Sequence, residues 1–558
     1  MPICRRWFSR TTYCSSASVF SDLSAYRYPC AVPAASEDLS LPTRFLRMTD
    51  ENRVDNETVG RPVEGSMKRK LAVGAGWMTV LQLSSKVVEV GFIAVLARIL
   101  FPDDFGVIAG AAIFIQLASL LVEVGIGATI VQIPNLTRTD LRIGGTIVFL
   151  NGVGYFLLAQ LLAPFAGDFM GIAGVEPVIR VLALVFIIQS FGIVSENVLV
   201  RDLEVRRVMI AQLMARVIGT GVIGIALAWA GWGYWTLVVA TLAETTVKAL
   251  WLVLLVRPPM RPLLTRAGAA RLMRRGAGFS LSKVINFFAL RADNAIVGRT
   301  MDAAALGLYS RAYNLMNVPA DLYSRIAERI VFPAMAKVQD DPARLRSAFL
   351  RGLELTAIFG LPISALLALL APEVILLILG PRWVAVIVPF AVLCSVTYLR
   401  LGTKISGSLQ RAKAATGAMI TNQIVYAGMV IGGCLLAYPY GIVAVAGAVS
   451  VAVAAFYLIV NYNACRLAGV GFVDFVRVHA HGALLALACT LVAAPVVLGM
   501  RAAALPPIAI LVAAGSAVAT LGVILILLRP RWMLGDLMIE LLGDAGRLTK
   551  RFRRKAPR

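Results

Sequence analysis

Ionisable side chains within long apolar segments are the residues of this sequence best suited to chemistry. Placing such a group in a membrane-spanning helix costs about 2.5–3.5 kcal/mol on insertion scales unless it faces a cavity or a partner. These positions are therefore candidates for ligand binding, ion coupling or gating. In sequence order they are Lys86, Glu89, Glu123, Glu196, Arg216, Glu244, Lys248, Lys283, Arg291, Asp293, Arg311, Asp321, Arg325, Glu328, Arg329 and Glu354.

Three sets of these residues place opposite charges three or four positions apart. In a helix this spacing puts the side chains on one face, where they form partly neutralised pairs. The last of the three sets is also a candidate for gate pairs that separate when the protein changes conformation. The sets are Lys86 with Glu89, Glu244 with Lys248, and Arg325 with Glu328 and Arg329.

The composition of the chain is that of an integral membrane protein. Of its 558 residues, 59% are hydrophobic and the mean hydropathy is +0.79, whereas soluble domains are about 45–50% apolar. The net charge of +23 does not indicate a nucleic-acid partner, because the basic residues cluster in short joints between apolar runs. Seven cysteines without a CxxC pair and two histidines argue against a metal or redox site, so neither metal nor cofactor is expected.

Fourteen apolar segments are long enough to cross a bilayer, which takes roughly 20 residues of helix. The predicted fold is therefore all-α, with about fourteen transmembrane helices. Residues 1–66 contain no such segment, and we interpret them as a disordered or mis-assigned extension before Met67-Lys-Arg-Lys. The predicted spans are 75–98, 105–127, 142–163, 178–199, 208–230, 233–256, 277–299, 304–334, 348–370, 384–402, 415–437, 440–462, 482–500 and 506–528.

Basic residues are concentrated in alternate joints between these spans. Because positive charge favours the cytoplasmic side, this pattern predicts an even number of spans with both termini in the cytoplasm. It counts Arg400 and Lys404 among the basic residues of the cytoplasmic joint at the end of the span 384–402. The longest basic joint, 257–275, is expected to link two halves, and 529–558 is expected to form a basic cytoplasmic tail.

A short pattern recurs at the ends of the first and seventh predicted spans. Both copies have the same predicted orientation, as in a parallel repeat about an axis along the membrane normal. Two similar halves that face one another leave a cavity between them, which is typical of transporters. The matching positions are Ala94 with Ala295, Arg98 with Arg299, and Gly106 with Gly307. The two arginines lie where their side chains can reach the membrane surface.

Three stretches resemble the Wzx-type polysaccharide and lipid-linked oligosaccharide flippases of the MOP exporter superfamily: LARILFPDDFG at 96–106, RADNAIVGR at 291–299 and LGLYSRAY at 306–313. The resemblance implies two six-helix bundles in a V-shaped arrangement, followed by two added helices. It also implies alternating access that moves an undecaprenyl-pyrophosphate-linked oligosaccharide across the bacterial inner membrane. Its partners would be that lipid-linked substrate, membrane lipid, and the polysaccharide polymerase and export machinery. The bundles are expected at 67–256 and 276–463, and the added helices at 464–528.

A pyrophosphate substrate implies a cavity with cationic side chains. Arginine matches phosphate oxygens with a planar fork, and lysine supplies a point charge. We expect Lys86, Lys283, Arg291 and Arg311 to contact this head group. The alternative for Arg291 is an ion pair with Asp293 or with a carboxylate on a neighbouring helix.

Three carboxylates are candidates for binding a coupling proton or sodium ion. They are Glu89, Glu123 and Asp293. Nothing in the sequence identifies the ion.

Three other kinds of function are alternatives to this one. A membrane enzyme such as a polymerase or glycosyltransferase would need a sizeable loop to hold donor and acceptor, and every predicted outer joint is short. An exporter of cationic drugs would favour an acidic cavity, whereas the charges here are balanced or basic. A peptidoglycan-precursor flippase, which would share the topology, remains an alternative.

Overall fold

The computed structural model describes residues 67–122, 126–133, 136–259, 261–266 and 280–528. The predicted N-terminal extension, the basic tail and most of the predicted linker lie outside these ranges. All the described residues belong to one compact unit.

The first half of the chain consists of helices whose ends follow from local sequence. For example, Thr137 and Asp140 form a reciprocal capping box, with the Asp140 N–H donating to Thr137 Oγ1 at 3.1 Å, which fixes the start of α4. The elements are α1 (Met67–Ile99), α2 (Pro102–Val122), α3 (Ile126–Gln132), α4 (Arg138–Met170), α5 (Val175–Leu182), α6 (Leu184–Arg201), α7 (Val205–Arg216), the π-helical segment η1 (Val217–Gly224), α8 (Ile225–Trp229) and α9 (Trp235–Val256).

The second half is built in the same way. Asp302 caps α12 by accepting the Ala305 N–H at 2.7 Å, and Asp341 caps α14. The elements are α11 (Ser280–Thr300), α12 (Ala303–Ile326), η3 (Ala327–Val331), α13 (Phe332–Lys337), α14 (Pro342–Leu369), α15 (Ala371–Ile378), η4 (Pro381–Val386), α16 (Ile387–Ser395), α17 (Thr397–Ala412), α18 (Thr416–Ala437), η5 (Tyr438–Tyr440), α19 (Ile442–Ala468), α20 (Phe472–Ala502) and α21 (Pro507–Leu528).

The expected all-α membrane fold is confirmed for the described residues. Each predicted span falls on a helix or on a bent run of helices. Within the ranges that the structure describes, ten helices or runs are long and apolar enough to cross a membrane. Because α1, α2, α11 and α12 are not among these ten, the count of fourteen spans stays a prediction.

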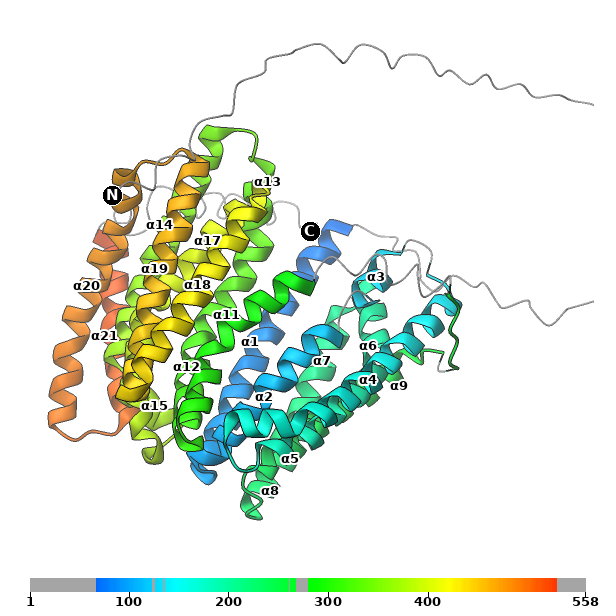
Figure 1. Ribbon diagram of the computed structural model, residues 1–558. Helices are drawn as coiled ribbons and strands as arrows, with labels where there is room; N and C mark the ends of the chain where they lie inside the picture. The colour runs from blue at the N-terminus through cyan, green and yellow to red at the C-terminus, as the bar shows by residue number, and fades with distance from the viewer. Residues whose placement is uncertain (1–66, 123–125, 134–135, 260, 267–279, 529–558) are drawn as a thin grey trace, which may run out of the picture. The chain divides into compact units, whose positions relative to one another are not determined.

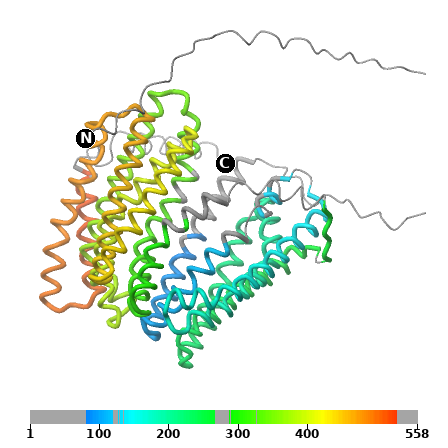
Figure 2. Tube along the Cα trace, viewed as in Figure 1, coloured from blue at the N-terminus to red at the C-terminus, as the bar shows by residue number. Residues whose placement is uncertain are grey.

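The two halves touch where the N-terminal turns of α2 and α12 meet (Figures 1 and 2). A Cβ atom at Gly106 would lie 1.8 Å from the carbonyl oxygen of Ala303, and one at Gly307 would lie 1.9 Å from that of Pro102. Only glycine allows helix backbones to approach so closely. These are the two glycines of the sequence repeat, so the repeat marks the contact between the halves.

Two side chains strengthen this contact beside α2 and α12. The Nη2 atom of Arg98 donates to the carbonyl oxygen of Leu377 at 2.8 Å. The indole Nε1 of Trp383, which is fully buried, donates to the carbonyl oxygen of Ala97 at 2.8 Å. The end of α1 is thereby held against α15 and η4 of the other half.

The two last helices pack on the second half, with α20 lying along α14 and α21 beside α20 (Figure 1). Arg501 near the end of α20 forms a two-pronged ion pair with Glu373 of α15, at 2.7 and 2.8 Å. At the start of α20, Asp474 pairs with Arg346 of α14 at 2.5 Å. Both ends of α20 are therefore fastened to the same half of the chain.

Candidate functional site

A cavity of about 650 Å³ is lined by α1, α11, α12, α17, α18 and α19. Its size is within the usual range for ligand pockets, roughly 300–1,000 Å³. Five cationic side chains face two carboxylates in its wall, so the wall carries an excess of positive charge. The cations are Lys86, Arg291, Arg311, Arg400 and Lys404, and the carboxylates are Glu89 and Asp321.

Three of the four residues expected to contact an anionic head group line this one cavity. Lys86 comes from α1 of the first half, whereas Arg291 and Arg311 come from α11 and α12 of the second half. The fourth, Lys283, lies on α11, but its side chain is outside the described part of the structure.

Arg291 is not joined to Asp293 by any ion pair among the described residues. The Asp293 carboxylate is buried and accepts hydrogen bonds from Asn294 N at 2.7 Å and Asn294 Nδ2 at 3.0 Å. It also accepts one from the Tyr309 hydroxyl at 2.9 Å. No ion pair between Arg291 and Asp293 is present among the described residues, since positions two residues apart lie on different faces of a helix.

Arg400 has the most buried guanidinium of the cavity, with 9% of the residue exposed. Its Nη1 donates to the Tyr313 hydroxyl at 3.2 Å and, more weakly, to Asn317 Oδ1 at 3.5 Å. The Tyr313 ring lies 5.1 Å from the guanidinium carbon. Its Nε and Nη2 have no hydrogen-bond partner among the described residues.

Arg311 has a similar unsatisfied donor. Its guanidinium lies over the Phe105 ring at 4.5 Å, and its buried Nε has no partner among the described residues. Leaving a buried donor unpaired costs about 1–3 kcal/mol, and more when the group is charged. An anion would satisfy these donors if a rearrangement of the cavity wall exposed them.

Arg400 and Lys404 were not among the predicted site residues, because the pattern of basic residues assigned them to a cytoplasmic joint. In the structure, α17 continues to Ala412 and carries both residues into the cavity wall. A signal was present in the sequence: the two cations lie four residues apart, and the buried Ile405 and Leu409 lie on another face of the same helix.

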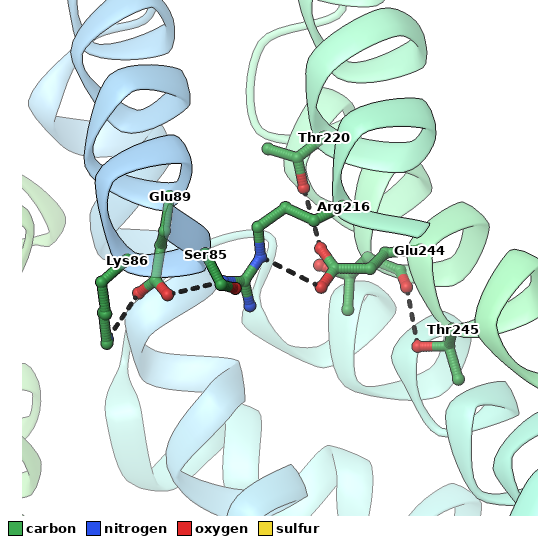
Figure 3. A network of polar contacts seen from close by, with 8 residues as sticks. Ser85, Lys86, Glu89, Arg216, Thr220, Glu244 and Thr245 are labelled. Carbon is green, nitrogen blue, oxygen red and sulfur yellow. Dashed lines mark hydrogen bonds and ion pairs between the residues drawn. The ribbon is translucent and has the colours of Figure 1, made fainter. Parts of the chain in front are cut away.

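A network of ion pairs supports Lys86 from the side of the first half (Figure 3). Lys86 Nζ pairs with Glu89 Oε1 at 3.0 Å, which confirms the expected pair on one helix face. Glu89 Oε2 pairs with Arg216 Nη1 at 2.7 Å, and Arg216 Nε pairs with Glu244 Oε1 at 3.3 Å. Thr220 Oγ1 donates to Glu244 Oε2 at 2.9 Å. The network thus joins α1 to α7, η1 and α9.

The expected pair of Glu244 with Lys248 does not form. Lys248 Nζ instead pairs with Glu196 Oε2 of α6 at 2.9 Å, since α6 packs against α9. All three residues line a second cavity, of about 240 Å³. Spacing along one helix could not reveal a partner supplied by another.

The remaining candidates are only partly described. Glu123 lies outside the described residues, as do the side chains of Arg325 and Arg329. Glu328 is exposed on η3. Within the described residues, no group of three or more histidine, cysteine, aspartate or glutamate side chains could hold a metal ion.

The fold and the cationic cavity define a membrane transporter, and sequence comparison identifies its kind. Residues 95–388 match the family described as "Polysaccharide biosynthesis protein", and the chain belongs to this family. The lipopolysaccharide biosynthesis protein WzxC of Escherichia coli (strain K12) is 28% identical over 360 residues, which cover 62% of this chain and 71% of that protein.

Two solved structures share the fold. The lipid II flippase MurJ in an inward closed conformation superposes with a TM-score of 0.60 at 12% identity, over 74% of this chain and 92% of that one. An inward-facing multidrug resistance MATE family transporter of the MOP superfamily superposes with a TM-score of 0.55 at 14% identity, over 70% of this chain and 98% of that one. The chain is therefore a multi-pass bacterial inner-membrane transporter of polysaccharide biosynthesis with the MOP fold.

Proposed function

We propose that this protein translocates undecaprenyl-pyrophosphate-linked oligosaccharide repeat units across the bacterial inner membrane by alternating access, with both termini in the cytoplasm. The observation that carries the proposal is the set of unpaired donors on Arg311 and Arg400 in a cavity with excess positive charge. The family match and the WzxC relative support a polysaccharide precursor as the cargo.

The cationic wall lowers the free energy of moving a pyrophosphate through the membrane. Charges about 4 Å apart attract by about 4 kcal/mol at an effective dielectric constant of 20, against about 1 kcal/mol in water. Arg311 and Arg400 bind phosphate oxygens through their free N–H groups. Lys86, Lys283, Arg291 and Lys404 add positive charge around them.

The remaining expected roles belong to the same proposal. Glu89, Glu123 or Asp293 binds a coupling ion, and the set at 325–329 forms gate pairs. The contact of α2 with α12 opens when the halves rotate. The polymerase and the export machinery receive the translocated repeat unit.

The peptidoglycan-precursor flippase is the second candidate, favoured by one observation. The superposition on MurJ shows that the same fold serves the flippase of lipid II. The family match over 95–388 favours a polysaccharide precursor instead. An exporter of cationic drugs is disfavoured by the five cations of the cavity wall.

A cargo assay in inverted membrane vesicles tests this proposal. Vesicles that contain the protein are supplied separately with labelled undecaprenyl-pyrophosphate oligosaccharide, with lipid II and with a cationic dye. We expect the oligosaccharide to reach the vesicle lumen, and vesicles without the protein serve as the control. Transport of lipid II alone would favour the second candidate, and transport of the dye alone would overturn both.

A further inference from the structure

The cavity has a long polar face that a pyrophosphate group alone does not require. Arg311, Asn314, Asn317, Asp321 and Ser324 all line the cavity from α12. Their spacing of three or four residues puts them on one side of the helix. At a rise of 1.5 Å per residue, this face is about 20 Å long. Only its first member is cationic, so most of the face is suited to a ligand other than phosphate.

Two amides of the cavity wall, one on α12 and one on α18, are free to bind a ligand. Asn314 of α12 and Gln423 of α18 line the cavity, and neither side chain is hydrogen-bonded to another described residue. Each amide offers two N–H donors and one acceptor oxygen. Polar groups within a membrane-spanning region need partners, which here must come from the contents of the cavity.

The same face also offers spare acceptors. Pro319 lies inside α12 and has no N–H to donate to the carbonyl oxygen of Leu315, one turn earlier. Leu315 is among the residues that line the cavity. Ser324 Oγ donates to the Ala320 carbonyl oxygen at 2.7 Å, which leaves its lone pairs available. The polar face therefore combines donors and acceptors along its length.

An aromatic pair forms another part of the wall. The rings of Tyr426 and Phe456 pack with centroids 4.5 Å apart and planes inclined by 35°. Both residues line the cavity. Such rings give an apolar surface to the C–H face of a ligand whose edges are polar.

From this arrangement we propose that Asn314, Asn317, Asp321 and Ser324 of α12, with Gln423 of α18, bind the sugar units next to the pyrophosphate through their hydroxyl groups. A sugar hydroxyl is both donor and acceptor, which matches this mixed and nearly neutral set. A lipid chain would leave these groups unpaired, and a second phosphate would be attracted to cations instead. The inference rests on the proposed function, since Arg311 places the head group at one end of this face.

Binding to the purified full-length protein in lipid nanodiscs tests the inference. One probe is undecaprenyl pyrophosphate without sugar, and the other is the lipid-linked oligosaccharide extracted from the producing bacterium. We expect the wild type to bind the glycosylated probe at least about tenfold more tightly, because each added hydrogen bond contributes about 0.5–1.5 kcal/mol and 1.4 kcal/mol is tenfold. The double variant Asn314→Leu/Gln423→Met should lose this advantage and still bind the bare probe.

Matched variants separate the possible failures. Ile424→Met changes a residue next to Gln423 that is 54% exposed, and it should behave as wild type. Arg400→Ala should weaken binding of both probes. A double variant that retains the advantage for the glycosylated probe would overturn the sugar site alone. A wild type that binds neither probe would overturn the proposed function and the sugar site with it.

Discussion

Arg311 and Arg400 hold donors that the described protein leaves unpaired, although both side chains are positioned by aromatic rings. Phe105 lies under Arg311 and Tyr313 under Arg400. Cation–π contacts of this kind contribute about 0.5–2 kcal/mol without using the N–H groups. The rings thus orient each guanidinium, while Nε of both arginines and Nη2 of Arg400 have no partner among the described residues.

Glu89 is shared by two cations, Lys86 and Arg216, and this sharing leads to a prediction about Lys86. In Glu89→Gln, a neutral amide cannot balance both charges, so Lys86 loses the partner that positions it at the cavity. Hydrogen bonds to charged groups contribute about 1.5–3 kcal/mol, and we expect transport to fall about tenfold or more. The measurement is the initial rate of oligosaccharide uptake into inverted vesicles, at matched protein levels.

The control for this variant is Glu204→Gln, which removes an exposed ion pair with Arg207. Such pairs contribute little, so uptake should stay at the wild-type rate. If Glu89→Gln also transports at that rate, Glu89 does not position Lys86 for transport.

At the scale of elements, the glycine contact between α2 and α12 gives a second prediction. In Gly106→Ala or Gly307→Ala, the new methyl group would collide with a backbone carbonyl, so the two helices must separate. We expect a lower melting temperature in detergent and reduced uptake for both variants. Gly91→Ala is the control, because no atom lies within 4 Å of its added Cβ. There the loss of glycine flexibility should leave stability unchanged or slightly raised.

The opposite outcome is clear for these three variants. If alanine is tolerated equally at positions 91, 106 and 307, the backbones of α2 and α12 do not meet as the structure shows.

The attachment of α20 gives a third prediction. In Arg501→Ala, Glu373 is left as an unpaired carboxylate with only 4% of its side chain exposed. Removing one partner of a buried ion pair costs about 3–5 kcal/mol, so the free energy of unfolding should fall by about that amount. Arg346→Ala removes a more exposed pair with Asp474 and should cost about 0–1 kcal/mol. Denaturant unfolding in detergent compares the two variants, and equal losses would show that Glu373 finds another partner.

The sequence predicted the positions of the helices better than the irregular segments within them. Hydropathy placed each predicted span on a helix or a bent run of helices, because a bilayer imposes a minimum length on each apolar segment. It gave no sign of the π-helical segment η1, where a Cβ at Gly219 would lie 2.5 Å from Glu244 N and one at Gly221 would lie 2.4 Å from Phe92 Cζ. That bend depends on packing between three helices, which a one-dimensional pattern does not contain.

The candidate site was predictable in part, because ionisable groups within membrane-spanning segments are rare and costly. Charges inside apolar segments pointed to Lys86, Arg291 and Arg311, and the structure brings them to one cavity. Arg400 and Lys404 were missed because the pattern of basic residues assigned them to a cytoplasmic joint. The domain boundaries and the roles of individual residues stay predictions.

At the scale of the whole molecule, one repeated pattern connects the sequence to the mechanism proposed here. Gly106 and Gly307 occupy equivalent places in the two halves and touch backbones of the opposite half. The cavity draws Lys86 from one half and the four other cations of its wall from the other half. A relative rotation of the halves would therefore change the surroundings of a bound anion, as alternating access requires.

The most direct test compares Arg400→Ala with wild type for translocation of labelled undecaprenyl-pyrophosphate oligosaccharide into inverted vesicles. Arg180→Ala is the matched control, since Arg180 forms an exposed pair with Glu176 outside the cavity. We predict a loss of about a hundredfold or more for Arg400→Ala, as removing a charged hydrogen-bonding group from a buried ligand costs about 3 kcal/mol. Arg180→Ala should transport normally. Translocation at the wild-type rate by a well-inserted Arg400→Ala variant would contradict the proposed anion site.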